Sequence, residues 1–282
     1  MRKKVVTIAC LAAAILIVLS AMISVSCSQQ ASPPPAQQQA TPTLTLPPWG
    51  AQHDRNAPQP AVVDPGEPST EAQAGKPPSD AVVLFNGKDL SNWESLNGGP
   101  ADWKVEKGDF ATVPGKGDIR TKQAFGDCQL HVEWATPNPP HGVDQDRGNS
   151  GVYLQSNFEI QVLDSYQSKT YPDGQASALY GQYAPLVNAC RPPGKWQTYD
   201  IVFHGPRFDA AGKLTRAATV TVIHNGVLVQ DHVTVLGRTD GEHEPYQPTP
   251  TKLPLKLQDH NHPVRYRNIW IREIPESQGG PA

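Results

Sequence analysis

The sequence predicts an all-β fold, a sandwich of two antiparallel sheets. One stretch, from Arg147 to Ser165, contains two short runs of alternating apolar and polar residues joined by a polar break, a pattern typical of a β-hairpin. Similar short runs recur from residue 82 to residue 274, separated by turns that contain Gly, Asp or Pro. Helical periodicity is absent from this part of the sequence. About a dozen short strands of this kind indicate a β-sandwich.

The first 27 residues have the layout of an export signal. Positive charges at Arg2 to Lys4 precede an apolar run from Val5 to Val25. Small residues end the run before Cys27 and resemble a bacterial lipoprotein cleavage site, so we expect a lipid on Cys27. An uncleaved membrane anchor is the alternative, because the run is close to the ~20 residues that span a bilayer. Both interpretations export the rest of the chain, anchored to a membrane and facing the periplasm or the cell exterior.

Residues 28–80 are predicted to form a disordered linker. They contain twelve of the 29 prolines and show no sustained hydrophobic period. Such a segment cannot bury enough apolar surface to offset its ordering entropy, and its prolines keep it extended. We therefore expect one folded domain over residues 81–275 and a short tail over residues 276–282.

The predicted domain begins with a short strand and the turn-prone residues Asn86 to Asp89. Asn225 and Gly226 are a strong signal for a two-residue hairpin turn. The predicted strands are residues 82–85, 103–106, 110–113, 128–134, 152–155, 158–163, 199–204, 218–224, 227–235, 253–257 and 264–274.

Charge and cysteine content limit the function. The formal net charge is −3 at pH 7, so the chain lacks the basic footprint of a nucleic-acid-binding protein. Two of the four cysteines lie in the first 27 residues, which leaves Cys128 and Cys190 in an exported domain. A disulfide between them is chemically permitted there. Two separate small buried residues are the equal alternative.

The hairpin between Arg147 and Ser165 separates its side chains onto two faces. In its second run Phe158 and Ile160 point to one face, while Glu159 and Gln161 point to the other. Pairing with the first run would bring Tyr153 and Gln155 beside these two polar residues, as a floor for a sugar. An antiparallel sheet with one solvated face produces the same alternation.

Several spaced motifs in this domain resemble the 3-keto-disaccharide hydrolase family of bacteria, first described as a domain of unknown function. The resemblance runs in order from about residue 81 to residue 274. It implies a concanavalin-like jelly roll, whose concave face holds carbohydrate, and cleavage of 3-keto-glycosides. The motifs are Leu84–Trp93 (LFNGKDLSNW), Arg147–Tyr153 (RGNSGVY), Glu159–Asp164 (EIQVLD), Pro193–Trp196 (PGKW), Leu257–His260 (LQDH) and Arg265–Trp270 (RYRNIW).

The chemistry that this resemblance suggests needs a base, an acid and a donor for an enolate oxygen. A ketone at C3 acidifies the C2 hydrogen of the sugar, so that a carboxylate can remove it, the C1 substituent can leave and water can add back. Glu159 is the first candidate for the base, because a carboxylate in the middle of a strand is costly to bury unless it is paired or functional. A surface carboxylate is the alternative. The base would otherwise be sought at His260, Glu133 or Asp164.

The other candidates are polar or charged residues in or near the motifs. Arg147 is a second catalytic candidate, because a guanidinium group suits carboxylates and sugar oxygens. His260 could be the acid, since it follows a strand end, where sandwich proteins often carry their sites. The expected substrate-binding residues are Tyr153, Asn149, Gln161, Gln258, Asp259, Arg267, Asp164 and Glu133.

Metal ligands and stacking aromatics are less specific signals. His260 and His262 are two residues apart, so their side chains would lie on the same side of an extended chain and could bind a divalent metal together with Asp259. No further residue has a spacing that indicates another metal ligand. We therefore expect no metal or other cofactor. Four tryptophans could stack on sugar rings, although aromatic residues at strand positions belong more often to the core. They are Trp93, Trp103, Trp196 and Trp270.

Two function classes follow from these observations. The first is an exported enzyme that cleaves 3-keto-glycosides. The second is a carbohydrate-binding module that uses the same face without turnover. A pocket that contains Glu159 and His260 would favour the enzyme, whereas a flat strip of aromatic side chains would favour the module.

The signal segment generates the first testable prediction. Mass spectrometry of the mature protein should find an N-terminus at Cys27 that carries a lipid, because small residues end the apolar run just before that cysteine. An unmodified chain that begins at another residue would contradict lipidation and leave export intact.

Overall fold

The computed structural model describes residues 62, 64, 66–239 and 244–275. The predicted signal segment with Cys27, residues 28–61 of the predicted linker and the predicted tail lie outside the described residues. Among the residues that are described, no helix is long and apolar enough to span a membrane.

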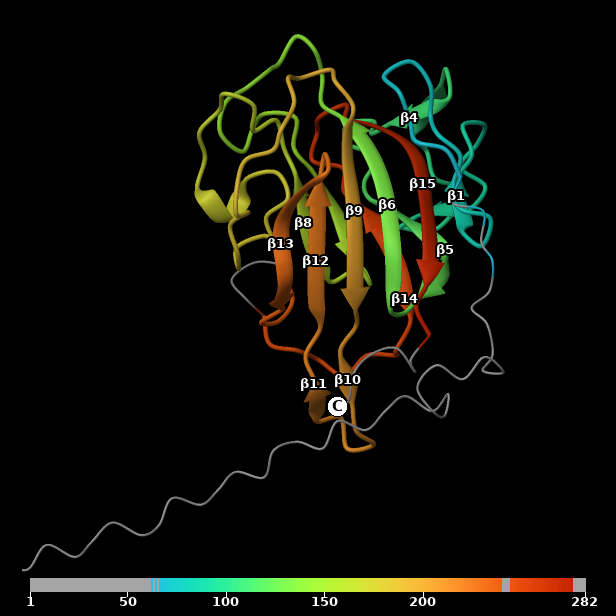
Figure 1. The fold of residues 1–282 in the computed structure, drawn as a ribbon, viewed down its shortest axis with the longest axis vertical. Helices are drawn as coiled ribbons and strands as arrows, with labels where there is room; N and C mark the ends of the chain where they lie inside the picture. The colour runs from blue at the N-terminus through green and yellow to red at the C-terminus, as the bar shows by residue number, and fades with distance from the viewer. Residues whose placement is uncertain (1–61, 63, 65, 240–243, 276–282) are drawn as a thin grey trace, which may run out of the picture. The chain divides into compact units, whose positions relative to one another are not determined.

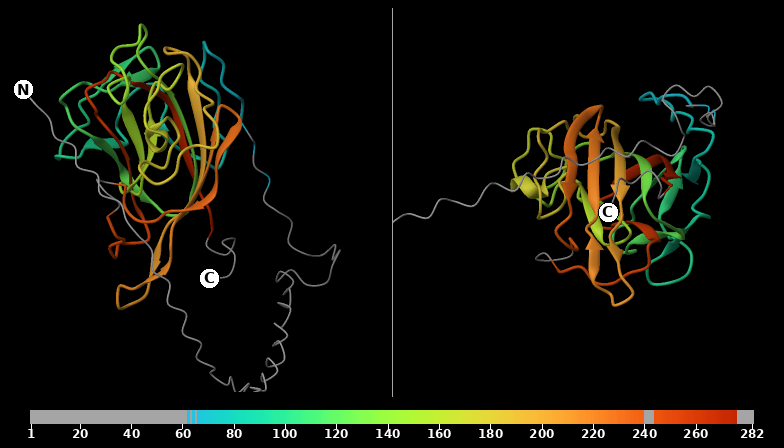
Figure 2. Two further views of the ribbon diagram at one scale, coloured as in Figure 1. Left: turned by 90° about the vertical axis from the view of Figure 1, so that its left-hand side faces the viewer. Right: turned by 60° about the horizontal axis from the view of Figure 1, so that its bottom comes forward.

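Two antiparallel sheets form the domain, as the sequence predicts (Figures 1 and 2). One sheet has eight strands: β13 (Val227–Thr234), β12 (Thr219–His224), β9 (Gln197–His204), β6 (Cys128–Ala135), β15 (Arg265–Glu273), β4 (Asp109–Ala111) and β3 (Lys104–Glu106) in this order, with β1 (Val82–Phe85) paired to β15. The other has five: β2 (Trp93–Ser95), β5 (Ile119–Phe125), β14 (Leu253–Leu257), β7 (Ser150–Leu154) and β8 (Phe158–Val162).

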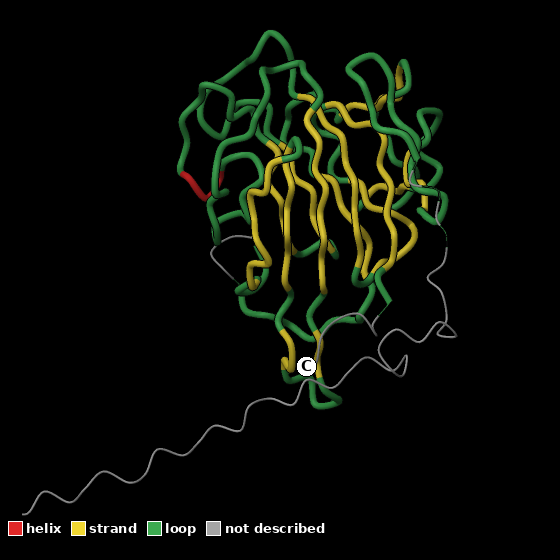
Figure 3. The backbone as a smooth tube through the Cα atoms, viewed as in Figure 1, coloured by secondary structure: helices red, strands yellow, loops and turns green. Residues whose placement is uncertain are grey.

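Little other regular structure accompanies the sheets. A small hairpin of β10 (Arg207–Phe208) and β11 (Leu214–Arg216) projects beyond one end of the sandwich, and η1 (Pro172–Gly174) is a single short 3₁₀ turn in the part of the chain that is described (Figures 2 and 3). Loops connect the strands at both ends. The all-β prediction is therefore confirmed.

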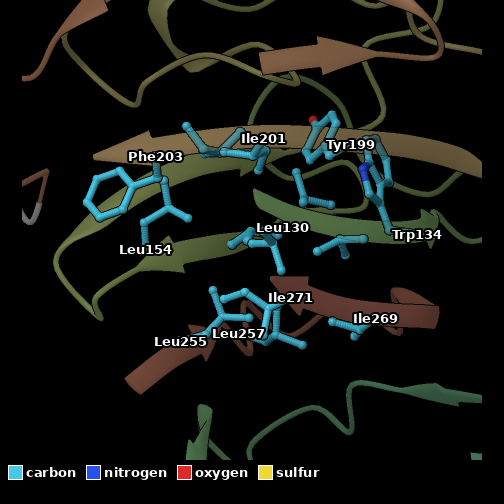
Figure 4. Close-up of a cluster of buried hydrophobic side chains, with 14 of the residues drawn as sticks. Leu130, Trp134, Leu154, Tyr199, Ile201, Phe203, Leu255, Leu257, Ile269 and Ile271 are labelled. Carbon is cyan, nitrogen blue, oxygen red and sulfur yellow. The ribbon is translucent and has the colours of Figure 1, made fainter. Parts of the chain in front are cut away.

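The core lies between the facing sides of the two sheets. Figure 4 shows Leu130 and Ile201 of the eight-stranded sheet beside Leu154 and Leu257 of the five-stranded sheet. Strand β6 shows why the sequence folds this way: Leu130, Val132 and Trp134 are fully buried and alternate with polar side chains on the outer face. The same alternation leaves polar residues on the outer faces of both sheets.

The cysteines and tryptophans have structural positions. Cys128 and Cys190 are both free thiols, and burial raises the pKa of the Cys128 thiol to about 12. Cys128 and Cys190 are therefore separate residues and form no disulfide with each other. All four tryptophans named above are buried, and the indole Nε1 atoms of Trp93 and Trp103 donate hydrogen bonds to backbone carbonyls.

The folded chain begins earlier than the predicted linker boundary at residue 80. Residues 66–80 contact the outer face of the eight-stranded sheet, where the Arg267 guanidinium donates hydrogen bonds to the carbonyls of Thr70 at 2.6 Å and Glu71 at 3.3 Å. The Ser69 hydroxyl also donates to Glu133. Polar contacts with buried charges hold this segment, so its lack of hydrophobic periodicity gave no sign of its packing.

A buried charge network lies beneath this segment. Glu133 Oε2 accepts a hydrogen bond from Arg267 Nε at 2.7 Å, while His131 contacts both Glu133 and Asp200, at 3.3 and 2.7 Å. Burial disfavours the imidazolium, but the hydrogen bonds to Asp200 and Glu133 outweigh it and raise the pKa of His131 to about 9. Burial also disfavours the carboxylate, but hydrogen bonds from His131, Ser69 and Asn268 and the charge of Arg267 lower the pKa of Glu133 to about 2.

This network predicts a pH dependence of stability. Because the pKa of His131 lies above its ordinary value of 6.5, its stabilisation is complete below that value and is lost as the pH rises through about 9. Between roughly pH 6 and roughly pH 10, wild type should lose on the order of 3 kcal/mol of unfolding free energy relative to His131→Gln. Urea unfolding of both proteins measures this difference. The contributions of the other titrating groups cancel because both proteins contain them. A difference that stays constant with pH would contradict the role of His131.

Candidate active site

A polar cavity opens on the outer face of the five-stranded sheet, the layer that contains β8 and β14 in Figure 1. Its volume is about 290 Å³. It is lined by Asn149, Tyr153, Glu159, Gln161, Tyr180, Thr239, Gln258 and His260. Six of these eight residues are among the site residues predicted from the sequence.

The β7–β8 hairpin positions the floor of this cavity. Tyr153 of β7 is the cross-strand partner of Glu159 of β8, so their outward side chains lie next to each other. Phe158, Ile160 and Val162 alternate with Glu159 and point into the core. This matches the predicted division of faces. Gln155 does not join Glu159 and Gln161 as predicted. Its backbone has a positive φ of 49°, and its side chain donates a hydrogen bond to the carbonyl of Thr251.

Glu159 is a buried carboxylate held by specific contacts. Its residue is 4% exposed, and its Oε2 atom accepts a hydrogen bond from the Tyr153 hydroxyl at 2.8 Å. The Tyr153 oxygen in turn accepts a hydrogen bond from Gln258 Nε2 at 3.1 Å. The backbone N–H of Glu159 donates to Thr239 Oγ1 at 2.9 Å. These contacts satisfy polar groups that would otherwise be costly to bury.

A glycine makes room for this carboxylate. Gly151 lies on β7 opposite Gln161, and a Cβ atom at residue 151 would be 2.3 Å from Glu159 Oε1 and 2.7 Å from Tyr153 Cε2. Any larger residue would therefore have to displace both side chains. The RGNSGVY motif thus contains the phenol of the pair and the glycine that leaves space for the carboxylate.

A lysine beside the cavity was missed in the sequence. Lys256 of β14 is the cross-strand neighbour of Tyr153, and its Nζ atom lies 3.6 Å from the centroid of the Tyr153 ring. Asp118 Oδ2 lies 2.9 Å from the same Nζ atom. The alternation of Leu255, Lys256 and Leu257 could have placed this lysine on the polar face of its strand.

Two predicted polar residues share an organising contact with Gln145. Gln161 Nε2 donates to Gln145 Oε1 at 3.0 Å, and Asn149 Nδ2 donates to the Gln145 carbonyl at 2.9 Å. Thr239 and Tyr180, which the sequence reasoning missed, complete the wall. Neither residue lies in one of the family-like motifs, so the sequence held no signal for them.

The LQDH motif and the residues after it form one rim. His260 is exposed and lines the cavity, and its ring stacks parallel to that of His262 with centroids 6.2 Å apart. The Asp259 carboxylate accepts hydrogen bonds from the backbone N–H groups of Gly117 and Asn261, both at 3.0 Å. Asp259 therefore shapes the loop. The described residues contain no group of three His, Cys, Asp or Glu side chains arranged to hold a metal ion.

Five predicted site residues do not line the cavity: Asp259, which holds its own loop, and four residues that form ion pairs. Arg147 forms an ion pair with Asp164, with 2.8 Å between Nε and Oδ2. Glu133 and Arg267 form the buried pair on the outer face of the eight-stranded sheet. The structure therefore brings Glu159 and His260 to one cavity and places these four residues in ion pairs elsewhere.

Comparison with known proteins agrees with this fold. A presumed glycosyl hydrolase from Parabacteroides distasonis is 45% identical, with a TM-score of 0.74 over 80% of this chain and 98% of its own. A second presumed glycosyl hydrolase of that organism is 22% identical, with a TM-score of 0.51 over 70% of this chain and 94% of its own, and shares the fold. No protein with a curated description matches the sequence significantly. Residues 80–272 match the 3-keto-alpha-glucoside-1,2-lyase-like domain, and the chain therefore belongs to this family, as its motifs suggested.

Proposed function

We propose that this protein is an exported enzyme that cleaves 3-keto-glycosides, with Glu159 as the base that removes the C2 proton. The observation that carries this proposal is a buried carboxylate in a polar cavity, in hydrogen-bond contact with the Tyr153 phenol. Membership of a family of carbohydrate-acting domains supports the substrate class.

The reaction uses the acidity that a C3 ketone gives to the C2 hydrogen. Removal of this proton produces an enolate, the bond between C1 and the glycosidic oxygen breaks, and water then adds to the unsaturated ketone. The overall result is cleavage of the glycoside. This route needs only one carboxylate beside the sugar, unlike the paired carboxylates of ordinary glycoside hydrolysis. The described cavity contains one carboxylate side chain among its lining residues.

Glu159 suits the base better than the other acidic candidates. Glu133 is bound by Arg267 and His131, and its pKa of about 2 makes it a weak base. Asp164 is engaged by Arg147 and lies outside the cavity lining. Glu159 lines the cavity and accepts a hydrogen bond from the Tyr153 hydroxyl. Geometry comes first in assigning a base, and only Glu159 among these three carboxylates lines the cavity.

The polar wall suits a sugar. Asn149, Gln161 and Gln258 supply amide groups that can exchange hydrogen bonds with hydroxyls and with the enolate oxygen. His260, the acid predicted from the sequence, stands at the solvent-exposed rim. Arg147 and Arg267, already bound to carboxylates, support the loop and the outer face rather than the sugar.

A non-catalytic binding module is the alternative function. Such a module typically presents aromatic faces for stacking on sugars. The tryptophans of this domain are buried outside the cavity, whose two aromatic residues are Tyr153 and Tyr180. The buried carboxylate therefore favours the enzyme. The carbohydrate would be the only partner of the cavity, and the N-terminal segment would anchor the enzyme to a membrane.

Substitution of the base tests this proposal. Glu159→Gln should lower turnover of a 3-keto-glycoside by about 10²–10⁴-fold, because general bases contribute by this factor, while sugar binding and folding are kept by the similar shape. In deuterated water, wild type should introduce deuterium at C2, and unmodified glycosides should not react. Wild-type turnover in the variant would show that Glu159 is a structural residue.

The space provided by Gly151 generates a matched prediction. Gly151→Ala should lower turnover by about 10²-fold, because its methyl group would displace Glu159 and Tyr153 and small misplacements of catalytic groups have effects of this size. Gly126→Ala is the control, since Gly126 also lacks a positive φ and the three atoms nearest to its Cβ would belong to Thr251 and Lys252, the closest being 3.3 Å away. Equal activities of the two variants in the folded state would contradict the positioning role of Gly151.

A further inference from the structure

We propose that Tyr153 is the acid that protonates the leaving group, and that Glu159 and Tyr153 act on one face of the sugar, which makes β-linked 3-keto-glucosides the substrates. This inference rests on the proposed function and deepens it. Its first support is the position of the two residues. They are cross-strand partners, each is 4% exposed, and the Tyr153 hydroxyl lies 2.8 Å from Glu159 Oε2.

The surroundings of Tyr153 stabilise the phenolate that proton donation would create. The Lys256 ammonium lies 3.6 Å from the ring centroid, where its positive charge favours negative charge on the ring system. Gln258 Nε2 donates a hydrogen bond to the phenol oxygen, a bond that strengthens when the oxygen becomes charged. Lys256 is held in place by Asp118 and by its strand.

Tyr153 is better placed for this step than His260. The phenol is buried in the floor of the cavity, directly beside the proposed base. His260 is an exposed residue of the rim, stacked on His262. An acid must reach the glycosidic oxygen, which is two bonds from C2, so it must act close to the base.

The proton transfers balance without another reactant. Glu159 takes the C2 proton, and the electrons of the C–H bond form the enolate. The bond between C1 and the glycosidic oxygen then breaks, the electron pair stays on that oxygen, and Tyr153 donates its proton there. The phenolate recovers a proton from the Glu159 carboxyl through their hydrogen bond. The products are an unsaturated ketone and an alcohol, and both residues return to their starting states.

The closeness of the two oxygens sets the stereochemistry. A base and an acid 2.8 Å apart can reach a C2 hydrogen and a C1 oxygen only when both lie on the same face of the ring. In a glucose-configured ring the C2 hydrogen shares its face with a β-linked oxygen, whereas an α-linked oxygen is on the opposite face. The substrates are therefore 1,2-trans glycosides, which departs from the α-glucosides in the description of the family.

Anomeric pairs of 3-keto-glucosides with identical leaving groups test this inference. Wild type should cleave the β-anomers at least about 10²-fold faster. Tyr153→Phe should lose about 10²–10⁴-fold with sugar or alkyl leaving groups, the usual contribution of an acid. The loss should be much smaller with 4-nitrophenol, which needs no protonation, because only the hydrogen bond that orients Glu159 is then missing, and the variant should still exchange the C2 hydrogen with deuterium. Tyr166→Phe, which removes a phenol outside the cavity, is the matched control.

The outcomes separate this inference from the proposed function. A wild type that acts on no 3-keto-glucoside overturns both. If Glu159→Gln is inactive but α-anomers react faster, or if Tyr153→Phe loses the same factor with every leaving group, the inference alone fails. If His260→Asn, rather than Tyr153→Phe, loses rate only with leaving groups that need protonation, then His260 at the rim is the acid. The anomeric preference of wild type decides the stereochemistry even if Tyr153→Phe does not fold.

Discussion

The candidate site depends on the antiparallel pairing of β7 with β8. This pairing places Tyr153 opposite Glu159 on the outer face. The residues that alternate with them along each strand, such as Val152 and Ile160, anchor the hairpin in the core. Because the side chains of a strand alternate, core packing of Ile160 fixes the direction of its neighbour Glu159. A shift of register by one residue would bury the carboxylate in the core. The rigid packing of the hydrophobic core therefore holds the side chains of the cavity in place before a substrate binds.

Two buried carboxylates on opposite sheets show how surroundings divide structural from chemical roles. Glu133 is paired with Arg267 and His131 and accepts a hydrogen bond from Ser69, which helps to join residues 66–80 to the sheet. Glu159 is oriented by a phenol and faces a cavity. Glu133 thus joins two charged neighbours on the eight-stranded sheet, whereas Glu159 lines the polar cavity that contains the amides of Asn149, Gln161 and Gln258.

The sequence identified the regular parts of this arrangement. Alternation was enough to find the hairpin and the outward direction of Glu159, because one face of each strand is core. It missed the strand at residues 119–125, since Thr121 is buried through hydrogen bonds rather than apolar contact, donating to the Gln123 carbonyl and accepting from the N–H of Leu255. Charge type alone could not separate Arg147, which is bound to its own neighbouring carboxylate, from a residue that faces the sugar.

For Glu159 to act as the base, C2 of a 3-keto-glycoside must bind against its side chain. A crystal structure of the Glu159→Gln variant with an intact 3-keto-glycoside measures this directly. We expect C2 within about 3.5 Å of the side chain of residue 159, the separation of a near-attack geometry, with the sugar hydroxyls on the amides of the cavity. A sugar bound with C2 turned away from residue 159, or bound on the outer face of the eight-stranded sheet, would contradict the role of Glu159 as the base.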